Sequence, residues 1–193
     1  MRTFLAVTIP LEIKNKIEKF IEEFKYETDK KRSNVKWVKI ENIHITIYFF
    51  GNVGNQDLSI LSNKLSEIGN TYPPFEISIK GVSAFPKPES PRVIWCGIID
   101  NSNTLRKTNG FVRDIIRDNN LNVDIDNREF SPHLTIGRVK GRYCDSLVKK
   151  IISSELREFG SFIINELVLF SSTLTKYGPI YNEIERYSFG RKG

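Results

Sequence analysis

Two short segments of the sequence each place a threonine two positions after a histidine. The first contains His44 and Thr46 in HITI, and the second contains His133 and Thr135 in HLTI. The chain has only these two histidines, so both begin the same pattern of His, apolar, Thr, Ile. Residues i and i+2 of a strand point to the same face, so each histidine shares a face with its threonine. The apolar residues between and after them are expected in the core: Ile45, Ile47, Leu134 and Ile136.

The pairing of a histidine with a threonine suggests acid–base chemistry on a phosphate. An imidazole exchanges a proton near neutral pH, and a neighbouring threonine hydroxyl can donate a hydrogen bond to a phosphoryl oxygen. Two such pairs facing each other across a cleft supply the general acid and the general base that in-line attack on a phosphodiester requires. No metal is then needed. The alternative for either motif alone is an ordinary half-buried polar pair, but the repetition favours catalysis.

Two other residues are weaker candidates for substrate binding. Tyr48 is expected on the same face as His44, where it could stack on a base or a sugar; a core or surface tyrosine is the alternative. Arg138 could hold a phosphate, although strict alternation places it opposite His133 and a bulge near Gly137 would be needed. A solvated strand end is the alternative for Arg138. Trp37 and Trp95 are assigned to the core.

The elements that position the motifs alternate between strands and helices. Strands are predicted over 3–9, 35–38, 43–50, 75–85, 93–99, 162–170 and 180–189, and helices follow Pro10 and cover 56–68, 102–119 and 145–158. Each half thus surrounds one histidine-bearing strand, and the histidines lie 133 − 44 = 89 residues apart. This symmetry indicates an ancient duplication. No linker separates the halves, so residues 1–193 are expected to form a single two-lobed domain.

Composition limits the classes of partner and compartment. The chain has 29 Lys and Arg against 23 Asp and Glu, a net charge of +6 that suits an anionic partner such as nucleic acid, or simply a basic soluble protein. Cys96 and Cys144 are isolated, which indicates neither a zinc site nor a redox motif. No apolar run is long enough to cross a membrane. A cytoplasmic monomer without cofactor or metal is therefore expected.

The sequence resembles the two-histidine phosphoesterases, and within them the bacterial and archaeal RNA 2′,3′-cyclic phosphodiesterases formerly described as 2′-5′ RNA ligases. The resemblance runs nearly end to end. It is carried by MRTFLAVTIP, by WVKIENIHITIYFFGNV and FSPHLTIGRVK with the two motifs, by FPKPESPRVIWCGI between them, and by LVLFSSTLTKYGPIYNEI near the end. Arg138 matches a basic residue that follows the family's second motif. Tyr48 is a departure, because a basic residue often occupies that place.

The resemblance implies an α+β, bilobal duplicated fold in which two antiparallel sheets line a central cleft, with helices outside. It implies hydrolysis of RNA 2′,3′-cyclic phosphate ends, or of cyclic nucleotides, to a 2′-phosphate. We assign His44 as the proton donor and His133 as the proton acceptor, although these roles could be exchanged. Thr46, Thr135 and Arg138 would bind the phosphate. The alternatives are 2′-5′ RNA ligation at the same site, essentially the reverse reaction, and a noncatalytic RNA-end binding module.

Overall fold

The computed structural model describes residues 1–28, 34–125, 128–176 and 178–190. The strands are β1 (Arg2–Thr8), β2 (Val35–Trp37), β3 (His44–Asn52), β4 (Phe75–Phe85), β5 (Val93–Ile99), β6 (His133–Val139), β7 (Glu158–Ile164), β8 (Glu166–Thr175) and β9 (Gly178–Ser188). The helices are α1 (Leu11–Thr28), the 3₁₀ turn η2 (Ile40–Asn42), α2 (Asn55–Leu65), α3 (Ile68–Thr71), α4 (Thr104–Asp118) and α5 (Asp145–Ser153).

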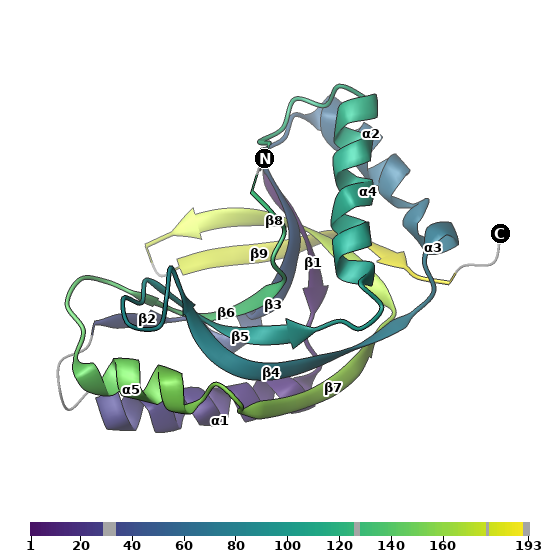
Figure 1. Ribbon diagram of the computed structural model, residues 1–193. Coiled ribbons are helices and arrows are strands. Elements are labelled where there is room, and N and C mark those ends of the chain that lie inside the picture. The colour runs from purple at the N-terminus through teal and green to yellow at the C-terminus, as the bar shows by residue number, and fades with distance from the viewer. Residues whose placement is uncertain (29–33, 126–127, 177, 191–193) are drawn as a thin grey trace.

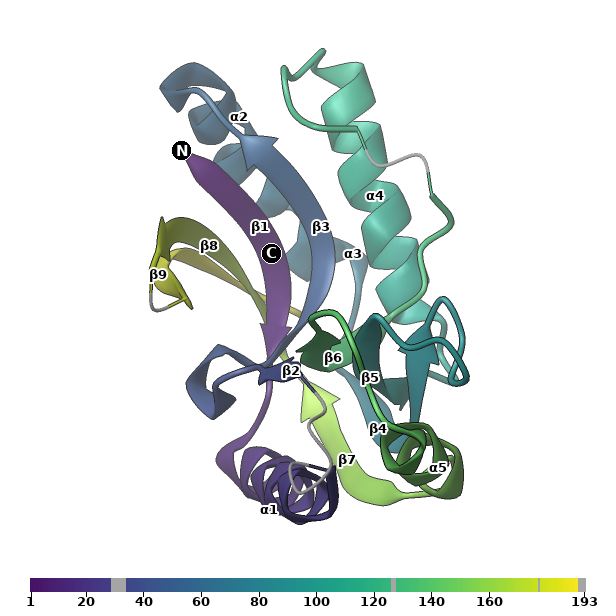
Figure 2. The ribbon, with the colours of Figure 1, turned by 90° about the vertical axis from the view of Figure 1, so that its left-hand side faces the viewer.

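All strands are antiparallel and follow the order β7-β4-β5-β6-β3-β1-β8-β9, with β2 beside β6. The first lobe consists of β1, β3, β8 and β9, and the second lobe consists of β4, β5, β6 and β7. The two lobes meet where β3 pairs with β6 at Ile45 and Leu134, near β2 in Figure 2. The predicted α+β, two-lobed class is confirmed, and its two sheets are joined at this pair.

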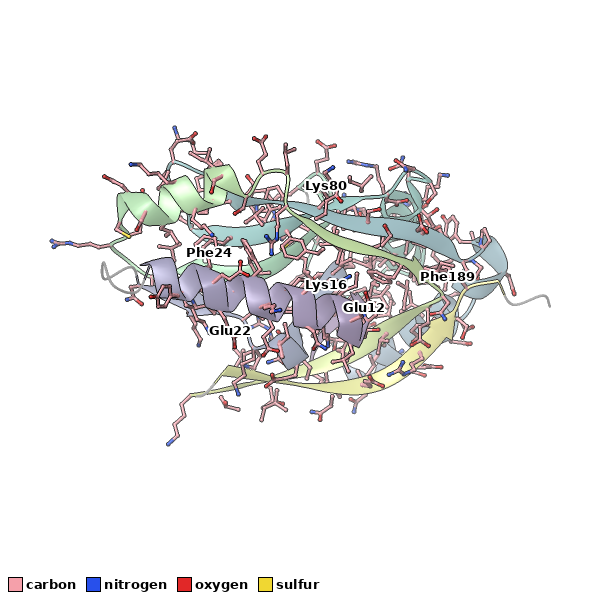
Figure 3. All side chains as sticks on the ribbon, turned by 90° about the horizontal axis from the view of Figure 1, so that it is seen from below. Glu12, Lys16, Glu22, Phe24, Lys80 and Phe189 are labelled. Atoms are coloured by element: carbon pink, nitrogen blue, oxygen red, sulfur yellow. The ribbon has the colours of Figure 1, made fainter. Side chains whose placement is uncertain are left out.

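The helices lie outside the strands and cross between the lobes. α4 follows β5 in the sequence but packs against β3 and α2, whereas α1 precedes β3 but packs against β7 and α5 (Figure 1). Figure 3 shows α1 and α5 side by side, with Glu12 and Lys16 as a salt bridge on α1. Five apolar residues of α1 recur at helical spacing and are buried, as that spacing predicts: Ile13, Ile17, Phe20, Ile21 and Phe24. This exchange of helices interlocks the two lobes.

Two predicted elements differ near the end of the chain. The helix predicted to reach Glu158 ends at Ser153, and the strand predicted over 162–170 is two strands separated by Asn165. The apolar run is divided because β7 pairs with β4 in the second lobe, whereas β8 pairs with β1 in the first. Within the described ranges, no helix is long and apolar enough to span a bilayer.

Candidate active site

The two motifs meet at the joint between the lobes. Ile45 pairs with Leu134 across antiparallel strands, and both side chains are fully buried. Extending this register by one residue each way sets His44 opposite Thr135 and Thr46 opposite His133 on the other face. The two histidines then occupy one diagonal of a square and the two threonines the other, with diagonal positions about 7 to 8 Å apart. All four side chains line one cavity.

The same local contact orients each imidazole. His44 Nδ1 lies 2.8 Å from the carbonyl oxygen of Asn42, and His133 Nδ1 lies 2.8 Å from that of Ser131. A carbonyl only accepts hydrogen bonds, so Nδ1 carries the proton in both rings. Nε2 of each neutral histidine is therefore the nitrogen that can accept a proton. Two sites built from different parts of the chain thus present the same atom for chemistry.

Burial and nearby cations favour the neutral form of both histidines. Burial lowers the pKa of His44, the bond to the Asn42 carbonyl raises it, and the charge of Lys14 lowers it. Burial also lowers the pKa of His133, the Ser131 carbonyl raises it, and the charges of Arg138 and Arg128 lower it. A bound phosphate anion acts in the opposite direction, because its negative charge favours an imidazolium. An anion bound between the histidines would therefore favour the protonated form of an imidazole.

Both motif strands contain a bulge directly after the threonine. The β1–β3 register passes from Thr46 to Tyr48 and omits Ile47. The β5–β6 register passes from Thr135 to Gly137 and omits Ile136. An extra residue reverses the alternation beyond it, so residues five positions after each histidine face the cavity. These residues are Phe49 and Arg138, and both line it.

The bulges correct one prediction and account for another. Tyr48 does not share the face of His44: only 4% of it is exposed, its ring packs against Phe50, and it does not line the cavity. The prediction of strict alternation was wrong because Ile47 shifts Tyr48 into the core. Arg138 reaches the cavity because the bulge at Ile136 supplies the distortion that its sequence position required.

Gly137 is adapted to this bulged wall. A Cβ atom at this position would lie 3.0 Å from Trp37 Cε3 and 3.1 Å from Val35 Cγ1. Trp37 belongs to the neighbouring strand β2, where it pairs with Gly137 of β6. It packs against Phe24 and also lines the cavity. The assignment of Trp37 to the core was therefore incomplete, since this residue packs against the core and also lines the cavity.

The cavity has a volume of about 500 Å³ and a strongly positive lining. Its cationic side chains are Arg2, Lys36, Lys39, Arg138 and Lys140. Of these, Lys39 lies 3.7 Å from a carboxylate oxygen of Glu41. Among the described residues, no carboxylate or thiol lines the cavity. This field attracts an anion, and the two histidines can act as acid and base on it.

Aromatic side chains flank each histidine. The ring of His44 lies 4.8 Å from that of Phe4 and 5.4 Å from that of Tyr181, while the ring of His133 lies 5.0 Å from that of Phe85. Sequence reasoning missed Arg2, Phe4 and Tyr181 as cavity residues. Arg2 and Phe4 alternate onto one face of β1, but no local signal indicates that β1 lies beside β3. Tyr181 belongs to β9, near the opposite end of the chain.

Comparisons with known proteins find relatives over nearly the whole chain. The family model described as LigT like phosphoesterase matches residues 7–95 and 100–181. The chain is 36% identical to an Archaeoglobus fulgidus protein named RNA 2′,3′-cyclic phosphodiesterase, covering 95% of this chain and 98% of the relative. A Methanothermobacter thermautotrophicus protein of the same name is 35% identical, with 96% and 97% covered. The crystal structure of E. coli LigT complexed with 3′-AMP superimposes with a TM-score of 0.76 at 20% identity, covering 98% of both chains.

Proposed function

Because the chain belongs to the LigT-like phosphoesterase family, we propose that it hydrolyses the 2′,3′-cyclic phosphate at an RNA end to a 2′-phosphate. The observation that carries the proposal is one cationic cavity lined by two histidines and two threonines, on strands that pair at Ile45 and Leu134. The names of its full-length relatives support the same activity. The enzyme is thus a phosphodiester hydrolase that acts on RNA ends or cyclic nucleotides.

The diagonal arrangement suits in-line attack. The entering water and the leaving oxygen must lie on opposite sides of phosphorus, and a phosphate above Ile45 and Leu134 has one histidine on each side. We assign His133 Nε2 to take a proton from water while its oxygen attacks phosphorus. His44, protonated at Nε2, gives its proton to the leaving 3′-oxygen as the P–O3′ bond breaks. The products are a 2′-phosphate and a 3′-hydroxyl, and proton exchange with solvent restores both histidines.

The other polar groups stabilise the charge that develops on phosphate. Thr46 and Thr135 lie on the second diagonal, where their hydroxyls donate to the two nonbridging oxygens. The guanidinium of Arg138 supplies a positive charge beside the His133 motif. These groups together account for proton transfer and charge stabilisation, so the proposed reaction uses no metal ion.

The two lobes act as one unit in this proposal, because each contributes one histidine and one threonine. Residues 1–193 are then a single functional domain, and a monomer holds a whole site. We also propose a cytoplasmic location, in keeping with two isolated cysteines that carry neither a zinc nor a redox motif.

The proposal is tested by incubating the purified protein with each 2′,3′-cyclic mononucleotide in EDTA and separating the 2′- and 3′-phosphate products. We expect turnover to the 2′-phosphate, with the same rate after a divalent metal is added. Binding without turnover would replace the proposal by an RNA-end binding module. Activity that EDTA removes and one metal restores would contradict the metal-free mechanism. An RNA with a 5′-hydroxyl, added to the same reaction, reports any 2′-5′ ligation as a longer product.

A further inference from the structure

The two lobes supply positive charge to the cavity in different ways. The bulges make Phe49 of the first motif equivalent to Arg138 of the second, so the first lobe has a neutral ring where the second has a guanidinium. In the first lobe, Arg2 of β1 supplies the positive charge that Phe49 lacks. Its guanidinium carbon lies 4.8 Å from the centre of the Phe49 ring, and both residues line the cavity. The first lobe therefore presents a cation supported on an aromatic ring.

The position of Arg2 in β1 is fixed by its neighbours on β3. The backbone N–H of Val53 donates to the carbonyl of Met1 at 2.8 Å, and Arg2 pairs with Asn52, which fixes the start of β1 against β3. In the part of the chain that the structure describes, Arg2 forms no ion pair. A guanidinium that rests on a ring keeps its N–H donors available for a phosphate.

The positive charges of Arg2 and Arg138 both act on Tyr181. Burial raises the pKa of the Tyr181 hydroxyl, while the charges of Arg138 and Arg2 both lower it. The Tyr181 ring lies against that of His44. The side-chain amide of Asn42, two residues before His44, donates to the carbonyl of Pro179, which belongs to β9 together with Tyr181. Tyr181 thus lies within the fields of both arginines, at the histidine end of the cavity.

Arg2 would lie further along the cavity than a phosphate held between the two histidines. Phe4 contacts the His44 ring, and Arg2 lies two residues from Phe4 on the same face of β1. Two residues of a strand advance by about 6.5 Å, a step that the backbone of one nucleotide can span. A phosphate bound by Arg2 would therefore be the neighbour of the phosphate between the histidines.

We propose that Arg2 binds the phosphate on the 5′-oxygen of the terminal nucleotide, so that the enzyme prefers RNA ends to cyclic mononucleotides. This inference rests on the proposed cyclic phosphodiesterase activity. The two arginines then bind different phosphates: Arg138 binds the cyclic phosphate, and Arg2 binds the next phosphate along the RNA. Phe49 is then a support that sets the height of the Arg2 guanidinium above the wall of the cavity.

The test compares kcat/KM for a cyclic mononucleotide with that for a dinucleotide ending in the same 2′,3′-cyclic phosphate. Arg2→Gln should lose at least about tenfold on the dinucleotide and much less on the mononucleotide, because one charge-assisted contact is missing. A dinucleotide with a neutral methylphosphonate linkage should show a similar loss with the unchanged enzyme. Arg2→Gln should add little to that loss, since both changes remove the same contact.

Arg157→Gln is the matched control. Its guanidinium carbon also lies over a phenylalanine ring, 5.6 Å from the centre of Phe20, but it does not line the cavity. This variant should preserve the preference for the dinucleotide. Equal losses on both substrates after Arg2→Gln would overturn the inference and place Arg2 on the cyclic phosphate. No loss on either substrate, in a variant with the wild-type melting temperature, would also overturn it. If the unchanged enzyme hydrolyses neither substrate, it is the proposed function that fails.

Discussion

Replacing Gly137 by alanine tests whether the wall beside Arg138 depends on close packing with Trp37. The new Cβ atom would lie 3.0 and 3.2 Å from two carbons of the Trp37 ring and 3.1 Å from Val35 Cγ1. Optimal carbon contacts are about 3.5 to 4.0 Å, so these neighbours must move by a few tenths of an ångström. Overpacking of this kind costs about 1 to 3 kcal/mol of unfolding free energy. For a chain of this size, each kcal/mol lowers Tm by roughly 2 to 4 °C.

The same change should reduce activity, because the strain falls on the cavity. Trp37 and Arg138 both line it, and Gly137 lies between the bulge and Arg138. Small displacements of positioning groups are costly, so we expect kcat/KM for a cyclic phosphate to fall by about tenfold. The assay combines thermal unfolding with steady-state kinetics on one preparation.

Gly110→Ala is the control for the glycine substitution itself. Gly110 lies within α4, and a Cβ atom there meets nothing within 4 Å. Alanine in a helix is favoured over glycine by about 0.5 to 1 kcal/mol, so this variant should be at least as stable as the wild type and equally active. If Gly137→Ala retains wild-type stability and activity, the reasoning about this wall is wrong.

Three further predictions concern the reacting groups. Burial lowers the pKa of His44 and His133, so the bell-shaped pH profile of kcat/KM should peak below the ordinary histidine pKa of about 6.5. The profile of kcat should peak at a higher pH, because bound phosphate raises both pKa values. A kcat/KM that stays constant from acid to alkaline pH would contradict this. Thr46→Val and Thr135→Val should each cost about 1 to 3 kcal/mol of transition-state stabilisation, measured as kcat/KM. Tyr48→Phe should leave kcat/KM within about threefold, since its hydroxyl is buried away from the cavity; a loss as large as that of the threonine variants would place it on the substrate.

The central residues could be predicted because a strand's alternation is local. Two residues are enough to place His44 with Thr46, or His133 with Thr135, on one face, and the buried isoleucines confirm the opposite face. The diagonal arrangement needs one further fact, the pairing of Ile45 with Leu134. That pairing joins strands far apart in the sequence, so no local pattern encodes it.

The errors have the same origin. Whether Tyr48 or Phe49 faces the cavity depends on a bulge at Ile47, and that bulge is defined only against β1. Arg138 follows the equivalent bulge at Ile136, which is defined against β5. Alternation alone therefore misplaced Tyr48 and could place Arg138 only with an added distortion. Arg2 was missed because no local pattern shows that β1 lies beside β3, where the Phe49 ring supports its guanidinium.

The central claim is that His44 and His133 act together on one phosphate, and a double-mutant cycle tests it most directly. The rate of cyclic phosphate opening should be measured for His44→Ala, His133→Ala and the double variant, with thermal unfolding to verify folding. Each single change should reduce kcat by about 10² to 10⁴. The kcat of the double variant should be little lower than that of the less active single variant, because the acid and the base act in the same transition state. Wild-type turnover in either single variant, or a double loss equal to the product of the two single losses, would contradict the account.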